Sequence, residues 1–475
     1  MPRRAQRRSK APEPNTTAIA SSVPDLKLIA REIFRDALAA SDIPGAMRQK
    51  LARAGSQLTA DRLTLDLAAY SSVRAVAIGK AAVAMTRGIA ELLAPDIPVT
   101  GILVAPHDSV TNVTGFRAMG AGHPLPDAGS LAAARAILDL LASTDARTLV
   151  FFLLSGGGSA LVELPLDPNV ALGDVQQLYR LLVGCGAPIE AINAVRKHVS
   201  AVKGGRLAAA APLAMKLTMG VSDVPYGQES ALASGPTLPD PTTTADALRV
   251  IERYALMPKL PAAFRSLFSH PEQIPETPKT GDPAFTRSEF LLLLGSSDLL
   301  DHARQAAEGN AKGRPEEKAK EKTEEKKCVV ACDSSTDDMP VGEAASRLLA
   351  RLERLRDANP GRRVVILADG EVSSPVTGNG VGGRNSAFVL HCVEKIAKKK
   401  IAVLSAGTDG KDGSSPAAGA VADGATLERA RAANLDPGDF ERRSDSYNFF
   451  RALGDAIETG PTGNNLRDLR ILLAE

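Results

Sequence analysis

The first candidate site is a run of two serines and three glycines that follows the apolar stretch at 149–154: Ser155, Gly156, Gly157, Gly158 and Ser159. Three consecutive glycines allow the backbone to turn sharply and to approach a ligand without Cβ atoms in between. A helix that begins after such a loop directs free N–H groups at an anion. The pattern favours a phosphate or carboxylate site at the carboxyl end of a strand, and a tight turn without a ligand is the alternative.

Two further cations come directly after glycines. Lys80 follows the segment VRAVAIG, and Arg384 follows TGNGVGG. The Lys80 segment lacks the spacing of a Walker A loop, but a lysine there can place its charge on a phosphate. Arg384 at a helix start suits an anionic substrate or a phosphoryl group in transfer. A surface lysine is the alternative interpretation of Lys80.

The glycines before Arg384 also have the formal spacing GxGxxG, at Gly378, Gly380 and Gly383. A dinucleotide fingerprint needs a strand that runs directly into the glycines. Here the preceding strand is expected to end near Leu367, well before Gly378. A Rossmann-type nicotinamide site is therefore the weaker interpretation of this segment.

A third segment, NAVRKHVSAVKGGRL at 193–207, contains five basic residues and no acid. Arg196 and Lys203 lie one heptad apart, and Asn193 and Lys197 are i,i+4 neighbours on a helix. We predict that Asn193, Arg196 and Lys197 bind the substrate and that Lys203 contacts a nucleotide. A solvated basic helix face is the alternative.

Two acids are expected at strand ends. Asp223 follows the strand at 217–221 and Asp409 follows the strand at 401–404, each within a loop rich in glycine. Short carboxylates in such loops can bind Mg²⁺ or act as a general base. We predict both roles for the pair without dividing them, and a turn-rich connection is the alternative for the Asp409 loop.

The candidate site residues can act together only if the fold places the ends of their strands close to one another. Amphipathic helices alternate with short apolar strands from residue 25 onward, which predicts an α/β fold with mostly parallel sheets covered by helices on both faces. Helices are expected at 26–41, 80–93 and 130–143, the last with Asp127 as its cap. The strands that they separate are expected at six places: 73–78, 101–105, 148–154, 328–331, 363–367 and 401–404. A final strand is expected at 469–473.

The chain of 475 residues is long enough for two or three domains. We predict an N-terminal α/β domain at 25–270 and a C-terminal α/β domain at 285–475, divided by the Pro-rich stretch 271–283. Residues 308–327 form a highly charged insertion without large apolar residues, which predicts a solvated loop. Residues 1–24 are basic and rich in Pro, Ser and Thr, so we expect a disordered tail, with a transit peptide as the alternative.

The composition limits the partners and the compartment. The net charge is +2, and residues 1–24 hold five bases and one acid, so the rest of the chain is slightly acidic. This balance argues against a nucleic-acid partner. The longest apolar runs are too short to span a bilayer, and the four cysteines form no CxxC pair or disulfide framework. We therefore expect a cytoplasmic protein without a membrane partner, and a homo-oligomer is possible.

Eight ordered motifs together resemble the class II glycerate kinases, the glycerate 2-kinases whose C-terminal half is the MOFRL domain. The motifs are IGKAA (78–82), GHPLPDAGS (122–130), SGGGSAL (155–161), NAVRKHVS with KGG (193–205), SDV with ASGPT (222–237), GGRN (382–385), GTDG (407–410) and TGPTG (459–463). The resemblance implies ATP- and Mg²⁺-dependent phosphorylation of D-glycerate on its 2-hydroxyl, in a cleft between two α/β/α domains.

Within that family, the residues that match Lys80 and Arg384 resemble active-site groups. The chain departs from the family pattern at Ser386 and Ala387, where Gln-Glu is usual, and at Gln228 after Gly227. Two rivals to the kinase stay open at this stage. One is an NAD(P)H-dependent hydroxypyruvate reductase, and the other is a non-catalytic nucleotide-binding regulator on the same scaffold.

Overall fold

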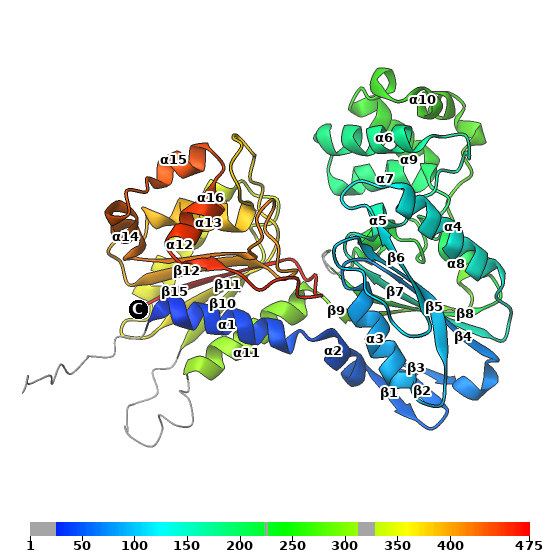
Figure 1. Cartoon of the computed structure of the whole chain (residues 1–475), viewed down its shortest axis with the longest axis horizontal. Helices are drawn as coiled ribbons and strands as arrows, with labels where there is room; N and C mark the ends of the chain where they lie inside the picture. Colours follow the sequence, from blue (N-terminus) through cyan, green and yellow to red (C-terminus); the bar gives the residue numbers. More distant parts are fainter. Residues whose placement is uncertain (1–24, 223, 225–226, 312–327) are drawn as a thin grey trace, which may run out of the picture.

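The computed structural model describes residues 25–222, 224, 227–311 and 328–475. Its centre is formed by two six-stranded sheets, each with helices on both faces (Figure 1). The α/β/α architecture predicted from the sequence is thus confirmed. Within the described residues, none of the helices combines the length and the apolarity that crossing a membrane requires.

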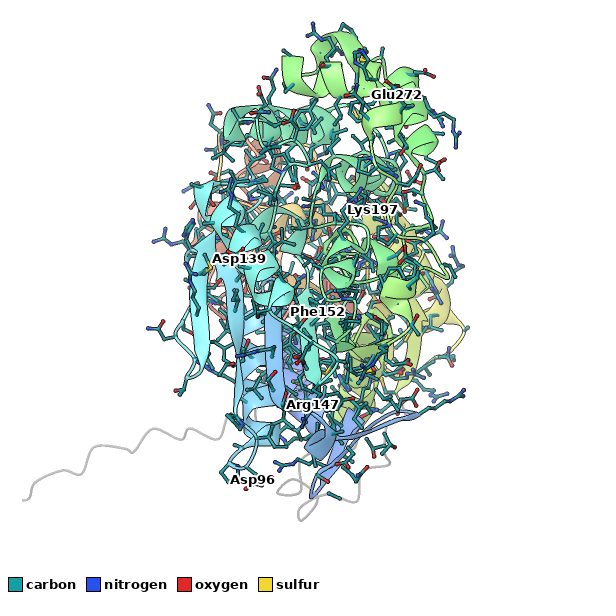
Figure 2. The ribbon with its side chains drawn as sticks, turned by 90° about the vertical axis from the view of Figure 1, so that its right-hand side faces the viewer. Asp96, Asp139, Arg147, Phe152, Lys197 and Glu272 are labelled. Carbon is teal, nitrogen blue, oxygen red and sulfur yellow. The ribbon has the colours of Figure 1, made fainter. Side chains whose placement is uncertain are left out.

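The first sheet is entirely parallel, as predicted. In spatial order its strands are β6 (Phe116–Ala121), β5 (Val99–Pro106), β4 (Ser72–Ile78), β7 (Thr148–Ser155), β8 (Met215–Val221) and β9 (Ser288–Leu294). Every residue of β7 is buried, because helices cover both faces of the sheet at this central strand. Figure 2 shows Arg147, just before β7, and Lys197 on opposite sides of Phe152, so Lys197 lies beyond the carboxyl end of the strand.

Helices cover the two faces and the carboxyl edge of the first sheet. One face packs against α2 (Ile43–Lys50) and α3 (Ala82–Leu93), and the other against α4 (Ala128–Ala142), α5 (Gly158–Leu161) and α8 (Arg206–Ala209). Asp127 caps α4 as predicted, because its carboxylate accepts from Ser130 N at 3.0 Å. A separate helical cluster stands above the sheet: α6 (Leu172–Gly184), α7 (Ile189–Val199), α9 (Thr244–Arg253) and α10 (Ala262–Ser269).

The second sheet corrects the prediction of mostly parallel strands. Its spatial order is β10 (Val329–Asp333), β11 (Val364–Ala368), β15 (Asp468–Ala474), β12 (Ile401–Gly407), β13 (Gly419–Asp423) and β14 (Ala456–Ile457). Only β10 and β11 pair in parallel, and the other four pairings are antiparallel. The reason is that β13 returns directly beside β12, and the final strand then inserts between β11 and β12.

The helices of the second sheet come from both ends of the chain. One face carries α12 (Val341–Asp357), α13 (Arg384–Val393) and α16 (Ser446–Ala452). Two shorter helices belong to the same apolar cluster, α14 (Thr426–Ala432) and α15 (Pro437–Arg442), and α15 contacts α13 and α16. The other face packs against α1 (Leu26–Ala40) and α11 (Ser296–Ala311), which lie side by side.

Two elements therefore lie with a different sheet from the one that the sequence division predicts. The helix α1 packs against β12, β13 and β15 of the second sheet, with Ile33 and Phe34 buried, and Lys27 pairs with Asp455 at 2.9 Å. The strand β9 hydrogen-bonds to β8 in the first sheet. The chain crosses between the sheets after α1 and again after β9, and one continuous apolar cluster includes residues of both sheets.

A small antiparallel sheet that the sequence analysis missed lies beside the first sheet, with strands β1 (Leu51–Ala54), β2 (Gln57–Ala60) and β3 (Leu63–Asp66). The predicted tail at 1–24 and almost all of the charged insertion at 308–327 lie outside the described residues.

Candidate active site

The turn that carries Lys80 is fixed against the serine–glycine loop. Gly79 directly follows β4 and has a φ of +129°, and a Cβ there would lie 2.2 Å from Ser155 Oγ, so only glycine fits. Lys80 N donates to Gly156 O at 3.0 Å, and Ala81 N donates to Ser155 Oγ at 3.0 Å. The neighbouring strands β4 and β7 thus bring the first two sequence motifs into direct contact.

The helix that follows the serine–glycine loop is shorter than predicted. The helix after Gly157 is a single turn, α5, rather than a full helix that could direct many N–H groups at a ligand. Gly157 has a φ of +84°, and Gly158 lies against Ala233, 2.7 Å from where a Cβ would be. Gly157 is therefore needed for its backbone conformation, and Gly158 for close packing. Lys80 lies beside this loop, with its Cγ 3.4 Å from an ideal Cβ on Gly157.

Lys80, which follows a strand of the first sheet, forms an ion pair with Asp409, which follows a strand of the second sheet. Lys80 Nζ lies 2.8 Å from Asp409 Oδ2, and both side chains are partly exposed. A second, longer pair joins the same two regions, with Lys411 Nζ at 3.5 Å from Asp108 Oδ2. Both acids follow carboxyl ends of strands, β5 for Asp108 and β12 for Asp409. The structure therefore brings the carboxyl edges of the two sheets together at charged side chains.

Arg384 lies close to this pair. It begins α13, and its guanidinium donates to Asp468 Oδ2 from Nε at 2.5 Å and lies 2.7 Å from Glu371 Oε1. An ideal Cβ on Gly407 would lie 3.2 Å from Asp409 Oδ1 and 3.3 Å from Asp468 Oδ1, so the two acids flank one glycine. Burial alone would lower the pKa of Arg384, but Asp468 and Glu371 outweigh it and raise the pKa above its ordinary value.

The structure describes only one of the two predicted metal ligands, Asp409. Asp223 lies outside the described residues. Among the residues that the structure describes, no three His, Cys, Asp or Glu side chains gather as a metal site. Asp409 is a hard oxygen donor that faces a cation, Lys80, and Mg²⁺ commonly takes one or two carboxylates together with substrate phosphates. The donor set at Asp409 therefore fits a phosphate-bound Mg²⁺ and not an all-protein metal cage.

Two lysines of the basic segment have acidic partners from other parts of the chain. Lys197 Nζ donates to Asp240 Oδ1 at 3.0 Å, and Lys203 Nζ donates to Glu163 Oε2 at 2.8 Å. All four side chains are almost completely buried. Burial lowers the pKa of Lys203, and the charge of Glu163 opposes this effect. The excess of basic residues in this segment is thus partly neutralised inside the protein.

Arg196 differs from its neighbour Lys197. It is 8% exposed and lies 4.3 Å above the centre of the Tyr179 ring, but no acceptor among the described residues receives a hydrogen bond from its guanidinium. Its Nε is completely buried. A buried, stacked guanidinium with no protein acceptor in the described part of the chain is suited to an anionic group of a ligand.

Asn193 is linked to the serine–glycine loop through Ser234. Ser234 Oγ lies 2.8 Å from Ser159 Oγ and donates to Asn193 Oδ1 at 3.1 Å. Ala233 and Ser234 both have left-handed backbone, with φ of +51° and +62°. This conformation is unfavourable for residues with a Cβ, and such strain is concentrated at functional sites. It holds the Ser234 hydroxyl between the other two side chains.

The glycines of the GxGxxG segment have a packing role. Ideal Cβ atoms on Gly378 and Gly380 would lie within 2.5 Å of Arg443 and Asp445, and one on Gly383 would lie 2.3 Å from Asp412 Oδ1. Their preceding strand β11 ends at Ala368, as predicted. This segment therefore packs against the chain near residue 445 and lacks the strand-to-helix turn that a dinucleotide requires.

The departure at Ser386 also has a structural explanation. Its side chain is buried and donates to Asp412 Oδ2 at 2.6 Å, while Ala387 packs in the core of the second sheet. Asp412 in turn accepts from Asn385 N and Ser386 N at the start of α13. Ser386 thus stabilises the helix that positions Arg384.

Two residues that the sequence analysis gave no role lie in this site. Glu163 accepts from Lys203, from Ser200 Oγ at 2.6 Å and from the Tyr179 hydroxyl. His123 follows β6, close to Gly157. A histidine between Gly and Pro directly after a strand was a usable signal for the latter, whereas nothing around Glu163 in the sequence indicates its buried lysine.

Comparison with known proteins agrees with this arrangement. Residues 29–269 match the family described as "Domain of unknown function (DUF4147)", and residues 364–468 match the "MOFRL family". D-glycerate 2-kinase of Thermotoga maritima is 32% identical over 447 residues, which cover 94% of this chain and 98% of that protein. A protein of Agrobacterium vitis, provisionally named hydroxypyruvate reductase, is 36% identical over 84% of this chain and 86% of its own length.

The crystal structure of a glycerate kinase from Thermotoga maritima has the same fold. It superposes with a TM-score of 0.76 at 31% identity, over 95% of this chain and 99% of that one. The matches extend over both sheets and over all the motifs that meet at Lys80 and Asp409. The chain belongs to the class II glycerate kinases, the MOFRL-containing family of the glycerate 2-kinases.

Proposed function

We propose that the protein transfers a phosphoryl group from ATP to the 2-hydroxyl of D-glycerate, giving 2-phosphoglycerate. The observation that carries the proposal is the meeting of Lys80 and Asp409 at the carboxyl edges of the two sheets, beside the serine–glycine loop. Phosphoryl transfer depends mainly on positioning and on charge, and this place provides both. Family membership and full-length similarity to D-glycerate 2-kinase support the same assignment.

The charged side chains divide into two groups by their partners. Lys80 and Arg384 are proposed to neutralise the phosphoryl group, since their ion-pair partners among the described residues are carboxylates that a more highly charged ligand could replace. Arg196 is proposed to hold the glycerate carboxylate, because its guanidinium has no acceptor among the described residues. Asn193, connected to Ser159 through Ser234, would orient a hydroxyl or carboxylate of the same substrate.

Lys203 and Lys197 take indirect roles in this proposal. Their ammonium groups are held by Glu163 and Asp240, so they stabilise the segment that carries Arg196. The assignment of Lys203 as a nucleotide contact and of Lys197 as a substrate contact remains a prediction. Either contact would require the lysine to leave a buried acid, at a cost of several kcal/mol.

ATP and Mg²⁺ are part of the proposal. Asp409 is the described residue suited to hold Mg²⁺, and Asp223 is the second candidate. The ion would neutralise the phosphate oxygens and keep them in line. The serine–glycine loop, with Ser155 and Gly156 fixed to the Lys80 turn, would approach the nucleotide phosphates through its backbone. The free thiols of the four cysteines fit a reducing, cytoplasmic location.

The deciding experiment uses purified protein, ATP, MgCl₂ and D-glycerate, with the product identified by ³¹P NMR. We expect 2-phosphoglycerate. Formation of 3-phosphoglycerate alone, or no product with any nucleoside triphosphate, would contradict the assignment. Oxidation of NADH by hydroxypyruvate, followed by absorbance, would favour the reductase instead. Calorimetric binding of ATP without turnover would favour a regulatory protein.

A further inference from the structure

His123 is the histidine that combines a position in the candidate site with free ring nitrogens. An ideal Cβ on Gly157 would lie 3.1 Å from His123 Cδ2 and 3.2 Å from Nε2, and 3.4 Å from Lys80 Cγ. The imidazole, the glycine backbone and the Lys80 stem are therefore packed together. A side chain at position 157 would displace the ring, so Gly157 also provides the space for His123.

The turn that carries His123 is closely packed. Gly122 leaves no room for a side chain, because a Cβ would lie 2.4 Å from Leu125 O. Asp127 closes the same turn and caps α4, accepting from Ser130 N. The histidine thus stands between the last residue of β6 and a fixed helix start. Close packing and capping of the supporting turn are what a ligand-contacting group requires.

The other five histidines are occupied. Each has a partner within 3.5 Å: His107 with Asp127, His198 with Ala194 O, His270 with Ser266 O, His302 with Ser41 Oγ, and His391 with Glu441. Within the described residues, His123 makes no hydrogen bond or ion pair, although the charges of Lys80, Asp409, Asp108 and Lys411 act on it. Its ring nitrogens are available to a ligand.

Charges from both sheets act on the ring. Lys80 and Lys411 disfavour its protonation, while Asp409 and Asp108 favour it. The His123 side chain is open to solvent, but desolvation where it packs against Gly157, followed by the charge of Lys80, lowers the pKa of His123 to about 4. At neutral pH the imidazole is therefore uncharged, with one nitrogen that donates and one that accepts.

We infer that His123 is a further catalytic residue, whose ring donates a hydrogen bond to a phosphate oxygen held between Lys80 and the backbone of Gly157. The inference rests on the proposed kinase function and adds a residue to it. A neutral donor suits this place, because Lys80 already supplies positive charge and a second cation beside it would be repelled. In this role His123 neither gains nor loses a proton, and it forms no covalent bond.

The test compares four variants by steady-state kinetics and thermal melting. His123→Ala is expected to lower kcat by about 10²-fold with little change in the KM for D-glycerate, as for the loss of one donor to developing charge. His123→Gln keeps an N–H donor and should recover at least about tenfold of that loss. His123→Phe fills the space without a donor and should not recover it. His270→Ala is the control, since the His270 ring is exposed and contacts Ser266 O four residues earlier in the chain.

Several outcomes would overturn the inference. Near-normal kcat in His123→Ala, or equal rescue by Phe and Gln, would reduce the residue to packing. Loss of an ionisation between pH 5.5 and 8 from the kcat/KM profile of His123→Gln would show that the wild-type imidazole works as an acid or base rather than as a neutral donor.

A failed kinase assay is a different result from a failed inference. If wild-type protein forms no product, calorimetry with ATP and Mg²⁺ still tests the contact, and His123→Ala should weaken ATP binding by about tenfold. Unchanged ATP affinity in that variant, or no ATP binding by wild type, would contradict the role given to His123.

Discussion

Lys80 and Asp409 form an ion pair of 2.8 Å although they are 329 residues apart in the chain. Each comes from the carboxyl edge of a different sheet, so the pair joins the two halves of the candidate site. The two residues neutralise each other in this structure. A phosphate for Lys80 and a hydrated cation for Asp409 would replace that mutual neutralisation with stronger partners.

Removing either proposed transition-state cation should affect the rate more than binding. We expect Lys80→Ala and Arg384→Ala to lower kcat by about 10²- to 10³-fold, with smaller changes in KM. Arg384→Lys should also be poor, because an ammonium cannot donate to Asp468 and Glu371 with the geometry of a guanidinium. Steady-state kinetics and thermal melting of the variants provide the measurement.

The matched control for Lys80 is Lys411, which also pairs with an aspartate of the other region but is well exposed. Lys411→Ala should keep near-normal kcat, since exposed pairs contribute little. Normal kcat in both Lys80→Ala and Arg384→Ala would remove these residues from the mechanism and leave Arg196 as the phosphate contact.

Neutralising Asp409 should separate its two proposed roles. Asp409→Asn releases Lys80 from its partner, so ATP binding in the absence of Mg²⁺ should be unchanged or tighter than in wild type. Turnover with Mg²⁺ should fall by at least about tenfold, because the oxygen donor has lost its charge. Calorimetry with EDTA and kinetics with varied MgCl₂ test the two halves, and weaker Mg²⁺-free binding would argue against competition between Asp409 and phosphate.

Arg196 and Lys197 are adjacent on α7 but should respond in opposite ways. Arg196→Met is expected to raise the KM for D-glycerate about tenfold or more, at almost unchanged melting temperature. Lys197→Met leaves Asp240 buried without its cation, which typically costs about 3–5 kcal/mol, so it should lower the melting temperature by several degrees. The reverse pattern would exchange the roles assigned to the two side chains.

The strained backbone at residues 233–235 gives a stability prediction. Ala233→Gly should stabilise the protein by up to about 1 kcal/mol, since glycine adopts a φ of +51° without strain. Gly235→Ala is the opposite case, because its Cβ would lie 2.4 Å from Ser230 O at a φ of +58°. Chemical denaturation measures both, and a destabilising Ala233→Gly would show that packing of its methyl group against Gly158 outweighs the strain.

Lys216 should make stability rise with pH in the alkaline range. Burial, with the charge of Arg287, lowers the pKa of this lysine to about 8 in the folded protein, against 10.5 as its ordinary value. Between these values the unfolded chain binds more protons than the folded one, so the free energy of unfolding increases as pH rises through this window. The contribution is constant below pH 8.

The comparison is with Lys216→Met at pH 7.5 and pH 10. Relative to this variant, the free energy of unfolding of wild type should be larger at pH 10 than at pH 7.5. An equal difference at the two pH values would show that the two carbonyls that accept from Lys216, those of Ala211 and Ala214, hold its charge without cost.

The first sheet could be predicted because its strands are short, apolar and separated by helices. For the second sheet, the same pattern wrongly predicted mostly parallel strands. A central strand such as β15 is buried on both faces whether its neighbours run parallel or antiparallel, so LRILLA contains no information on direction. The place of β9 and α1 could not be predicted either, because apolar residues indicate burial but not the sheet against which they are buried.

The candidate site was predictable where glycines and strand ends coincide, as at Lys80, Ser155 and Asp409. Partners distant in the chain were not predictable, and they changed the interpretation of the basic segment. Five bases without a nearby acid suggest an anion, but Glu163 and Asp240 supply the charge for two of them from other segments. Only the structure separates Arg196, which lacks such a partner among the described residues, from Lys197 and Lys203.

The packing of α1 has a consequence for folding. This helix stands at the start of the described chain, but the strands that it covers, β12 and β15, are at 401–407 and 468–474. During synthesis the part of α1 that packs against β15 stays uncovered until the final residues of the chain are made. Contacts between residues so far apart in the sequence slow folding, and they prolong the exposure of aggregation-prone apolar surface. Refolding yield should therefore depend on protein concentration, and removal of β15 should leave α1 as a site of aggregation.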